Sequence, residues 1–152
     1  MADGQKAIAW LQEHHGSSVI CTDHFREQHW AEIKLDDIQN VCRALKSQQE
    51  LDYDFLVDVT AVHWPDREQS IEIVYHLYSY AHDDRLRLKV RCGDAGPVPS
   101  LASIWLSASW NERETYDMFG IRFDGHPDLR RILMHEEYTD FPLRKELPLY
   151  RG

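Results

Sequence analysis

The sequence lacks the residue patterns that most cofactor and metal sites require. Its three cysteines, Cys21, Cys42 and Cys92, are far apart and form no C-x-x-C pair. No two of its nine histidines have the H-x-x-x-H spacing of zinc sites, and its seven glycines form neither a G-x-G-x-x-G nor a P-loop motif. We therefore expect reduced, mostly buried cysteines, no catalytic or cofactor-binding residue, and no metal on this chain.

Long apolar runs and an excess of positive charge are also missing. No uninterrupted apolar stretch approaches the ~18 residues that suggest a membrane span, and the amino terminus has no basic, apolar leader. We expect the chain to stay in the cytoplasm without inserting into a membrane. The net charge of −9 opposes binding to nucleic acid, because that affinity depends on lysine and arginine displacing counterions.

Apolar spacing over residues 1–92 predicts a single α+β core. Leu86, Leu88 and Val90 alternate with basic residues, which is typical of a strand with one buried and one wet face. The connections between the last three strands, 65–69 and 81–84, are too short for crossover helices, so these strands should be antiparallel. The expected elements are helix 3–16 capped by Asp3, strands 17–25 and 29–34, helix 36–47, and strands 54–64, 70–80 and 84–92. We predict a mostly antiparallel sheet with helices packed on one face.

The last third of the chain changes character. Residues 93–100 are a glycine- and proline-rich loop, 101–119 have helical spacing with an apolar side, and Gly120 is a natural stop. Residues 121–152 carry widely spaced prolines, leucines and charges with no period, which predicts an irregular extended arm. We expect a compact domain over 1–120 and an arm over 121–152. The composition alone leaves open whether the arm packs on a partner or on its own sheet.

A dense group of charges precedes this arm. Glu112, Glu114 and Asp117 could supply carboxylates for acid–base chemistry, because helical positions three apart share a side. A structural reading is favoured, because Arg113 and Asp117 are four apart and can pair, with Arg122, Arg130 or Arg131 reaching the other carboxylates. A free-standing hydrolase or binding protein that uses this cluster remains the alternative from another class.

The segment ERETYDMFGIRFDGHPDLRRIL (112–133) resembles the signature of the 30-kilodalton subunit family of respiratory complex I. The signature is Glu-Arg-Glu, two residues, an acid, two hydrophobics, six residues, His, three residues, a basic residue, one residue and two aliphatics. Its positions are filled by Glu112, Arg113, Glu114, Asp117, Met118, Phe119, His126, Arg130, Ile132 and Leu133. The segment FPLRKELPL (141–149) is similar to the closing segment of the same family.

The resemblance implies a peripheral subunit of a proton-translocating NADH:quinone oxidoreductase (complex I). Such a subunit scaffolds the quinone-reducing module without a redox cofactor of its own, while FMN and iron–sulfur clusters belong to partner subunits. Its partners would be the large subunit that forms the quinone pocket and the cluster-bearing subunits, at the cytoplasmic face of the plasma membrane. The resemblance also implies that the arm over 121–152 packs on a partner subunit. Equivalent subunits of membrane-bound hydrogenases, formate hydrogenlyases or the ferredoxin-dependent photosynthetic complex are the alternatives within the same fold.

The resemblance also assigns interface or structural roles, with no catalytic one. The acidic members would orient the helix and meet basic groups on a neighbour or in the arm. The residues are Glu112, Arg113, Glu114, Asp117, His126, Arg130, Arg131, Arg144 and Lys145. We expect Glu114→Ala or Asp117→Ala to lower the amount of assembled complex and to leave turnover per complex nearly intact.

Overall fold

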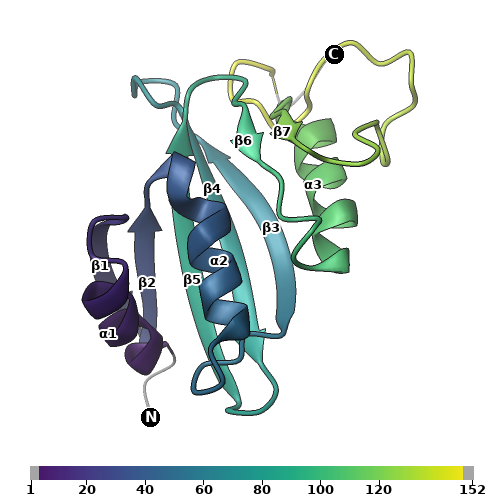
Figure 1. The fold of residues 1–152 in the computed structure, drawn as a ribbon. Coiled ribbons are helices and arrows are strands. Elements are labelled where there is room, and N and C mark those ends of the chain that lie inside the picture. Colours follow the sequence, from purple (N-terminus) through teal and green to yellow (C-terminus); the bar gives the residue numbers. More distant parts are fainter. Residues whose placement is uncertain (1–3, 149–152) are drawn as a thin grey trace.

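The computed structural model describes residues 4–148 (Figure 1). The predicted order of helices and strands is confirmed, and the capping role expected of Asp3 lies outside the described residues. The elements are α1 (Gln5–His14), β1 (Val19–Phe25), β2 (Gln28–Ile33), the short 3-10 helix η1 (Leu35–Asp37), α2 (Ile38–Ser47), β3 (Phe55–His63), β4 (Ile71–Ser79), β5 (Asp84–Cys92), β6 (Val98–Pro99), α3 (Leu106–Phe119) and β7 (Phe123–Asp124).

Five strands form one twisted sheet in the order β1-β2-β5-β4-β3. The pairs β1–β2, β3–β4 and β4–β5 are antiparallel, so the predicted meander of the last three strands is confirmed. The two halves of the sheet join through a parallel pairing of β2 with β5, in which Trp30 lies opposite Arg87. This parallel junction was not predicted, because nothing local in the sequence specifies which strands meet across 50 residues.

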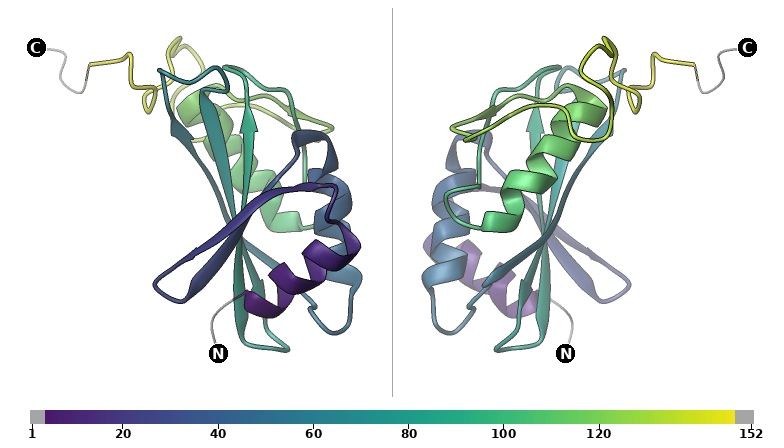
Figure 2. Two further views of the ribbon diagram at one scale, coloured as in Figure 1. Left: turned by 90° about the vertical axis from the view of Figure 1, so that its left-hand side faces the viewer. Right: turned by 90° about the vertical axis from the view of Figure 1, so that its right-hand side faces the viewer.

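The helices cover one face of the sheet, as predicted, and the other face is open (Figure 2). Along β5, Leu86, Leu88 and Val90 point into the core under α1 and α2, and the basic residues between them lie on the open face. Helix α3 packs beside β3, where the hydroxyl of Thr115 donates to the carbonyl of Val59 at 2.8 Å. The α+β class is therefore confirmed.

Helix α3 is shorter and more polar inside than its sequence pattern suggests. It begins at Leu106, after a turn over 101–104, although helical spacing extends from 101. Ala108 and Phe119 are buried as expected, but Glu112 and Asp117 are buried as well. The helix ends at Gly120, whose φ of 77° is left-handed and favours glycine.

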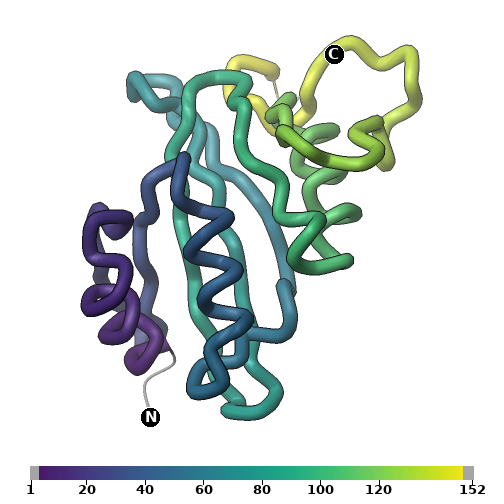
Figure 3. The backbone as a smooth tube through the Cα atoms, viewed as in Figure 1, coloured from purple at the N-terminus to yellow at the C-terminus, as the bar shows by residue number. Residues whose placement is uncertain are grey.

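Beyond α3 the chain has little regular structure. Val98 of β6 pairs in parallel with Phe123 of β7, and the described residues after β7 contain no further helix or strand. The chain then loops around the carboxyl-terminal end of α3 (Figure 3). The irregular arm that forms part of the predicted fold class is confirmed, whereas the division of the chain into domains at residue 120 remains a prediction.

The cysteines follow the expectation in part. All three are free thiols, and Cys42 and Cys92 are buried. Burial raises the pKa of Cys92 to about 11, so this thiol stays protonated at neutral pH. Cys21 is a free thiol as expected, but it is exposed on β1 and not buried.

Candidate subunit-interface site

Glu112 lies at the centre of the polar cluster and is completely buried. Its Oε2 accepts a hydrogen bond from the hydroxyl of Ser100, and its Oε1 accepts one from the backbone N–H of Leu101, both at 2.6 Å. These bonds fasten α3 to the turn that precedes it. The sequence did not indicate Ser100, because this residue lies in the loop before α3, 12 residues from Glu112.

Burial raises the pKa of Glu112 from 4.5 to about 7, against the opposing effect of its two hydrogen bonds. A carboxyl with such a pKa can serve as a general acid or base where a substrate reaches it. Glu112 has no exposed surface, and both of its carboxyl oxygens accept hydrogen bonds from the protein. Within the chain, these bonds hold α3 to the turn before it.

Asp117 holds residues 131–134 of the arm against α3. Its Oδ1 lies 2.7 Å from Nη1 of Arg131, and its Oδ2 accepts the backbone N–H groups of Ile132, Leu133 and Met134 at 3.1, 2.7 and 2.8 Å. Burial alone would raise the pKa of Asp117, but the hydrogen bonds from Met134, Arg131 and their neighbours outweigh it and hold the pKa below its usual value. Asp117 is thus an ionised anchor for residues 131–134.

The expected pairing of Arg113 with Asp117 is wrong. The Arg113 guanidinium donates instead to the backbone carbonyls of Arg130 and Arg131, at 3.2 and 3.0 Å. The carboxylate already has four donors from the arm, and it points into the protein, whereas Arg113 is half-exposed and also lies 5.1 Å from the ring of Trp110. Both residues hold residues 130–134 of the arm. Asp117 accepts hydrogen bonds from this stretch, and Arg113 donates hydrogen bonds to its backbone carbonyls.

His126 is a second attachment of the arm to α3. Its Nδ1 accepts the backbone N–H of Asp128 at 3.0 Å, so its Nε2 carries the proton and donates to the carbonyl of Ser109 at 2.8 Å. This pair of bonds requires the neutral tautomer with hydrogen on Nε2. Within the chain, His126 therefore fixes the turn after β7 to the first turn of α3.

Arg144 provides the third attachment. It is buried, its Nε donates to the carbonyl of Phe119, and its two terminal nitrogens bond to the side chain and backbone of Asp94. The neighbouring Lys145 contributes its backbone N–H to Nδ1 of His63 at 3.1 Å, and its side chain is exposed. Asp94 was not foreseen, since it lies in a loop 50 residues earlier.

Aromatic packing supports these polar attachments. The ring of Phe141 lies over Gly120, where an added Cβ would come within 2.6 Å of two ring carbons, and the ring also meets Tyr116 edge-on at 6.2 Å. The described part of the arm is therefore fastened to α3 and to the loop after β5. The resemblance implied an arm that packs on a partner subunit. The described residues are attached to their own domain, and packing of the arm on a partner remains a prediction.

The side chains of Glu114 and Arg130 lie apart from this network. Glu114 is exposed and makes no hydrogen bond or ion pair with the residues described, and Arg130 forms an exposed pair with Asp128 at 2.9 Å. The structure thus brings together Glu112, Arg113, Asp117, His126, Arg131 and Arg144 around α3, and leaves Glu114, Arg130 and the side chain of Lys145 facing solvent.

Large apolar side chains near this network also face solvent. Leu106 and Trp110 are one turn apart on α3 and are 89% and 62% exposed. In the arm, Leu133 is 62% and Leu143 is 54% exposed. Exposed apolar side chains that lie next to each other, as Leu106 and Trp110 do, are typical of surfaces that contact another protein.

The arrangement is suited to holding segments together. In residues 4–148 no group of three or more histidine, cysteine, aspartate or glutamate side chains is placed to hold a metal ion. Within the same range, no helix is long and apolar enough to cross a membrane. The two buried carboxylates are occupied by protein donors, which leaves a structural network beside an exposed apolar surface.

Known proteins share both the sequence and the fold. Residues 31–151 match the model of the family described as "Respiratory-chain NADH dehydrogenase, 30 Kd subunit". An NADH-quinone oxidoreductase subunit of Rhizobium meliloti (strain 1021) is 48% identical over 118 residues, which is 77% of this chain and 64% of that protein. The corresponding NADH-quinone oxidoreductase subunit of Geobacter metallireducens is 40% identical over 151 residues, which is 98% of this chain and 92% of that protein.

A solved structure agrees over nearly the whole chain. A chain from the membrane-bound sulfane sulfur reductase, an archaeal respiratory membrane complex, superimposes with a TM-score of 0.79 at 26% identity, covering 96% of this chain and 86% of that chain. The fold and the polar network define an α+β domain whose carboxyl-terminal arm is attached to its last helix, as in a subunit of a respiratory complex. The chain belongs to the 30-kilodalton subunit family of respiratory-chain NADH dehydrogenase, and the predicted resemblance is confirmed.

Proposed function

We propose that this chain is a subunit of an NADH-quinone oxidoreductase that scaffolds the quinone-reducing module. The observation that carries the proposal is the family signature itself. Its buried charges, Glu112 and Asp117, are used to fasten the helix and the arm, and they leave no accessible acid–base pair. The chain works without a redox group, and FMN and iron–sulfur clusters are carried by partner subunits.

The mechanism is positional. Electron transfer slows steeply with distance, so the subunits that hold the last cluster and the quinone must stay in fixed relation. A rigid α3 with three polar attachments presents the arm in one conformation, which lowers the entropy lost when a neighbour binds. The neighbour would be the large subunit that forms the quinone pocket, at the cytoplasmic face of the membrane.

The surface available for that neighbour lies along α3 and the arm. Leu106 and Trp110 expose apolar area on α3, and Leu133 and Leu143 are exposed apolar side chains of the arm. Glu114, Arg130 and Lys145 supply exposed charges around them. Apolar area with a charged rim is the usual composition of a protein–protein contact.

A second candidate keeps the fold and changes the complex. The likeness to a chain of an archaeal respiratory membrane complex supports an equivalent role beside another electron donor or acceptor. The hydrolase alternative is disfavoured, because neither Glu112 nor Asp117 has any exposed surface. The co-purifying subunits distinguish the first two candidates, since the donor-specific chains differ.

The experiment is purification of the chromosomally tagged chain after mild detergent extraction, followed by mass spectrometry. We expect the flavin-, cluster- and quinone-binding subunits of an NADH-quinone oxidoreductase to co-purify in constant ratio. Recovery of hydrogenase-type subunits in place of the NADH-oxidising ones would favour the second candidate. Recovery of the chain alone, as a folded monomer, would contradict both.

A further inference from the structure

The open face of the sheet has charges of two kinds. On the half near the end of β5, Lys89 Nζ lies 3.6 Å from Glu72 Oε1, and Arg91 Nε lies 3.3 Å from Oε1 of Glu32. Glu32 and Glu72 are both buried, so these positive charges are compensated at close range within the sheet. The positive charges of this half are therefore compensated by nearby carboxylates, although Arg91 Nε, like Arg87 Nε, has no hydrogen-bond partner among residues 4–148.

The positive charges on the half near the start of β5 are not compensated in this way. Among residues 4–148, no carboxylate forms an ion pair with Arg85 or Arg87, which occupy the same face four and two residues before Lys89. Arg87 Nη2 donates to Oε1 of Gln28 at 3.0 Å, while its Nε is buried without a hydrogen-bond partner in that range. A buried donor of this kind is costly unless a ligand or partner supplies an acceptor.

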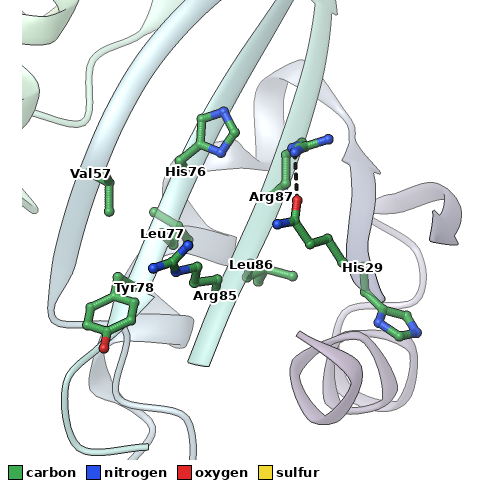
Figure 4. A pocket seen from close by; sticks show the side chains of 9 residues that line it. His29, Val57, His76, Leu77, Tyr78, Arg85, Leu86 and Arg87 are labelled. Atoms are coloured by element: carbon green, nitrogen blue, oxygen red, sulfur yellow. Dashed lines mark hydrogen bonds between the residues drawn. The ribbon is translucent and has the colours of Figure 1, made fainter. Parts of the chain in front are cut away.

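A cavity lies between these arginines and the neighbouring strands. Its volume is about 400 Å³, and its lining comes from β2, β3, β4 and β5. Figure 4 shows the guanidinium of Arg85 near the centre, with Tyr78 of β4 to its lower left, His76 of β4 above it and Arg87 to its upper right. Burial and the charge of Arg87 lower the pKa of His76, against the opposing effect of Asp58, so the positive charge here comes from the two arginines.

Exposed aromatic and aliphatic side chains border the cavity on the β3 side. Phe55 and Tyr80 lie 5.9 Å apart, Tyr80 meets the ring of Tyr78 edge-on at 4.9 Å, and Val57 is 49% exposed. Tyr80 is 65% exposed. Aromatic residues and arginine are enriched at protein interfaces. A small inorganic anion would make no favourable contact with these aromatic and aliphatic side chains.

We infer that this half of the open face is a docking surface for an acidic segment of another subunit. One carboxylate of that segment sits between Arg85 and Arg87, and an apolar neighbour packs on Val57 and Tyr78. Charge complementarity carries the choice of occupant, because this is an uncompensated positive patch on a chain of net charge −9. The inference rests on the proposed function only in requiring that the chain be assembled with other subunits.

The test is zero-length cross-linking in the assembled complex. Arg85→Lys keeps the charge and introduces an amine that a water-soluble carbodiimide joins to a carboxylate at ion-pair distance. We expect a new isopeptide link from residue 85 to an aspartate or glutamate of another subunit. Lys89 should link to Glu72 within the chain as the positive control, and Arg43→Lys on α2 should give no such link.

Charge reversal provides the second measurement. Arg85→Glu combined with Arg87→Glu should lower retention of the cross-linked subunit by about tenfold after a salt wash, the effect of losing a close charge pair across an interface. Lys34→Glu combined with Arg43→Glu changes the net charge equally at exposed sites away from this face and should leave retention unchanged. The thermal unfolding of both isolated double variants reports that the fold is kept.

Each remaining outcome overturns one claim. A link from residue 85 only to Asp58 or Asp83 of its own chain, to a second copy, or to nothing would overturn the docking surface, as would equal retention of the two double variants. In those cases the chain still co-purifies with its complex, and the proposed function stands. Failure of the wild-type chain to co-purify with any other subunit would instead overturn the proposed function.

Discussion

Replacing Asp117 by asparagine tests whether this carboxylate holds the start of the arm. The substitution keeps the size of the side chain and removes the charge that faces Arg131 at 2.7 Å, in a pair whose side chains are 0% and 10% exposed. Removing one partner of a buried pair typically costs about 3–5 kcal/mol. Because all the affected bonds end on residues 131–134, the cost should fall on this segment and leave the sheet intact.

Hydrogen exchange measures that local cost directly. The amides of Ile132, Leu133 and Met134 donate to Oδ2 of Asp117, so their exchange requires these bonds to open. A loss of about 3 kcal/mol raises the opening equilibrium by about two orders of magnitude. We expect these amides in Asp117→Asn to exchange about a hundredfold faster, while amides in the middle of β4 keep their wild-type rates.

Asp128→Asn is the matched control, because it removes a carboxylate from the same region with the same change of charge. Its pair with Arg130 is 55% and 64% exposed, and exposed pairs contribute about 0–1 kcal/mol. Its amide exchange over residues 131–134 should resemble the wild type. Equal exchange in the Asp117 and Asp128 variants would refute the anchoring role of Asp117.

Two further variants test the rest of the network. Because the pKa of Glu112 is raised from 4.5 to about 7, the folded state binds its proton more tightly, so stability is lost as pH rises through this window. Glu112→Gln, neutral throughout, should gain about 3 kcal/mol relative to wild type between pH 4.5 and 8 in urea unfolding; an unchanged difference would show that Glu112 titrates normally. Gly120→Ala should cost about 1–2 kcal/mol at constant pH, because Gly120 has φ 77° under the ring of Phe141; stability equal to wild type would contradict that geometry.

Local patterns in the sequence predicted the helices and strands, but they could not predict the hydrogen bonds and pairings between distant segments. Alternation along 84–92 identified β5 and its buried face, because the period of a strand is set by the backbone itself. The parallel junction of β2 with β5 has no such local marker. Its register follows from burying Ala31 beside Leu88, a contact between segments more than 50 residues apart.

The candidate site shows the same division. The signature identified Glu112 and Asp117 as important, and the spacing suggested Arg113 as the partner of Asp117. Spacing on one helix could not reveal that residues 131–134 would bring four donors to the same carboxylate. Partners such as Asp94, which lies 50 residues before Arg144, become visible only when the chain has folded.

The central claim is that this surface assembles a complex and does no chemistry. Glu114 tests it most directly, because it is part of the signature, is exposed, and has no hydrogen bond or ion pair among residues 4–148. The measurement is the amount of assembled complex and its quinone-reductase turnover per complex in membranes carrying Glu114→Ala. The account predicts less assembled complex with turnover per complex nearly unchanged; normal assembly with turnover abolished would contradict it.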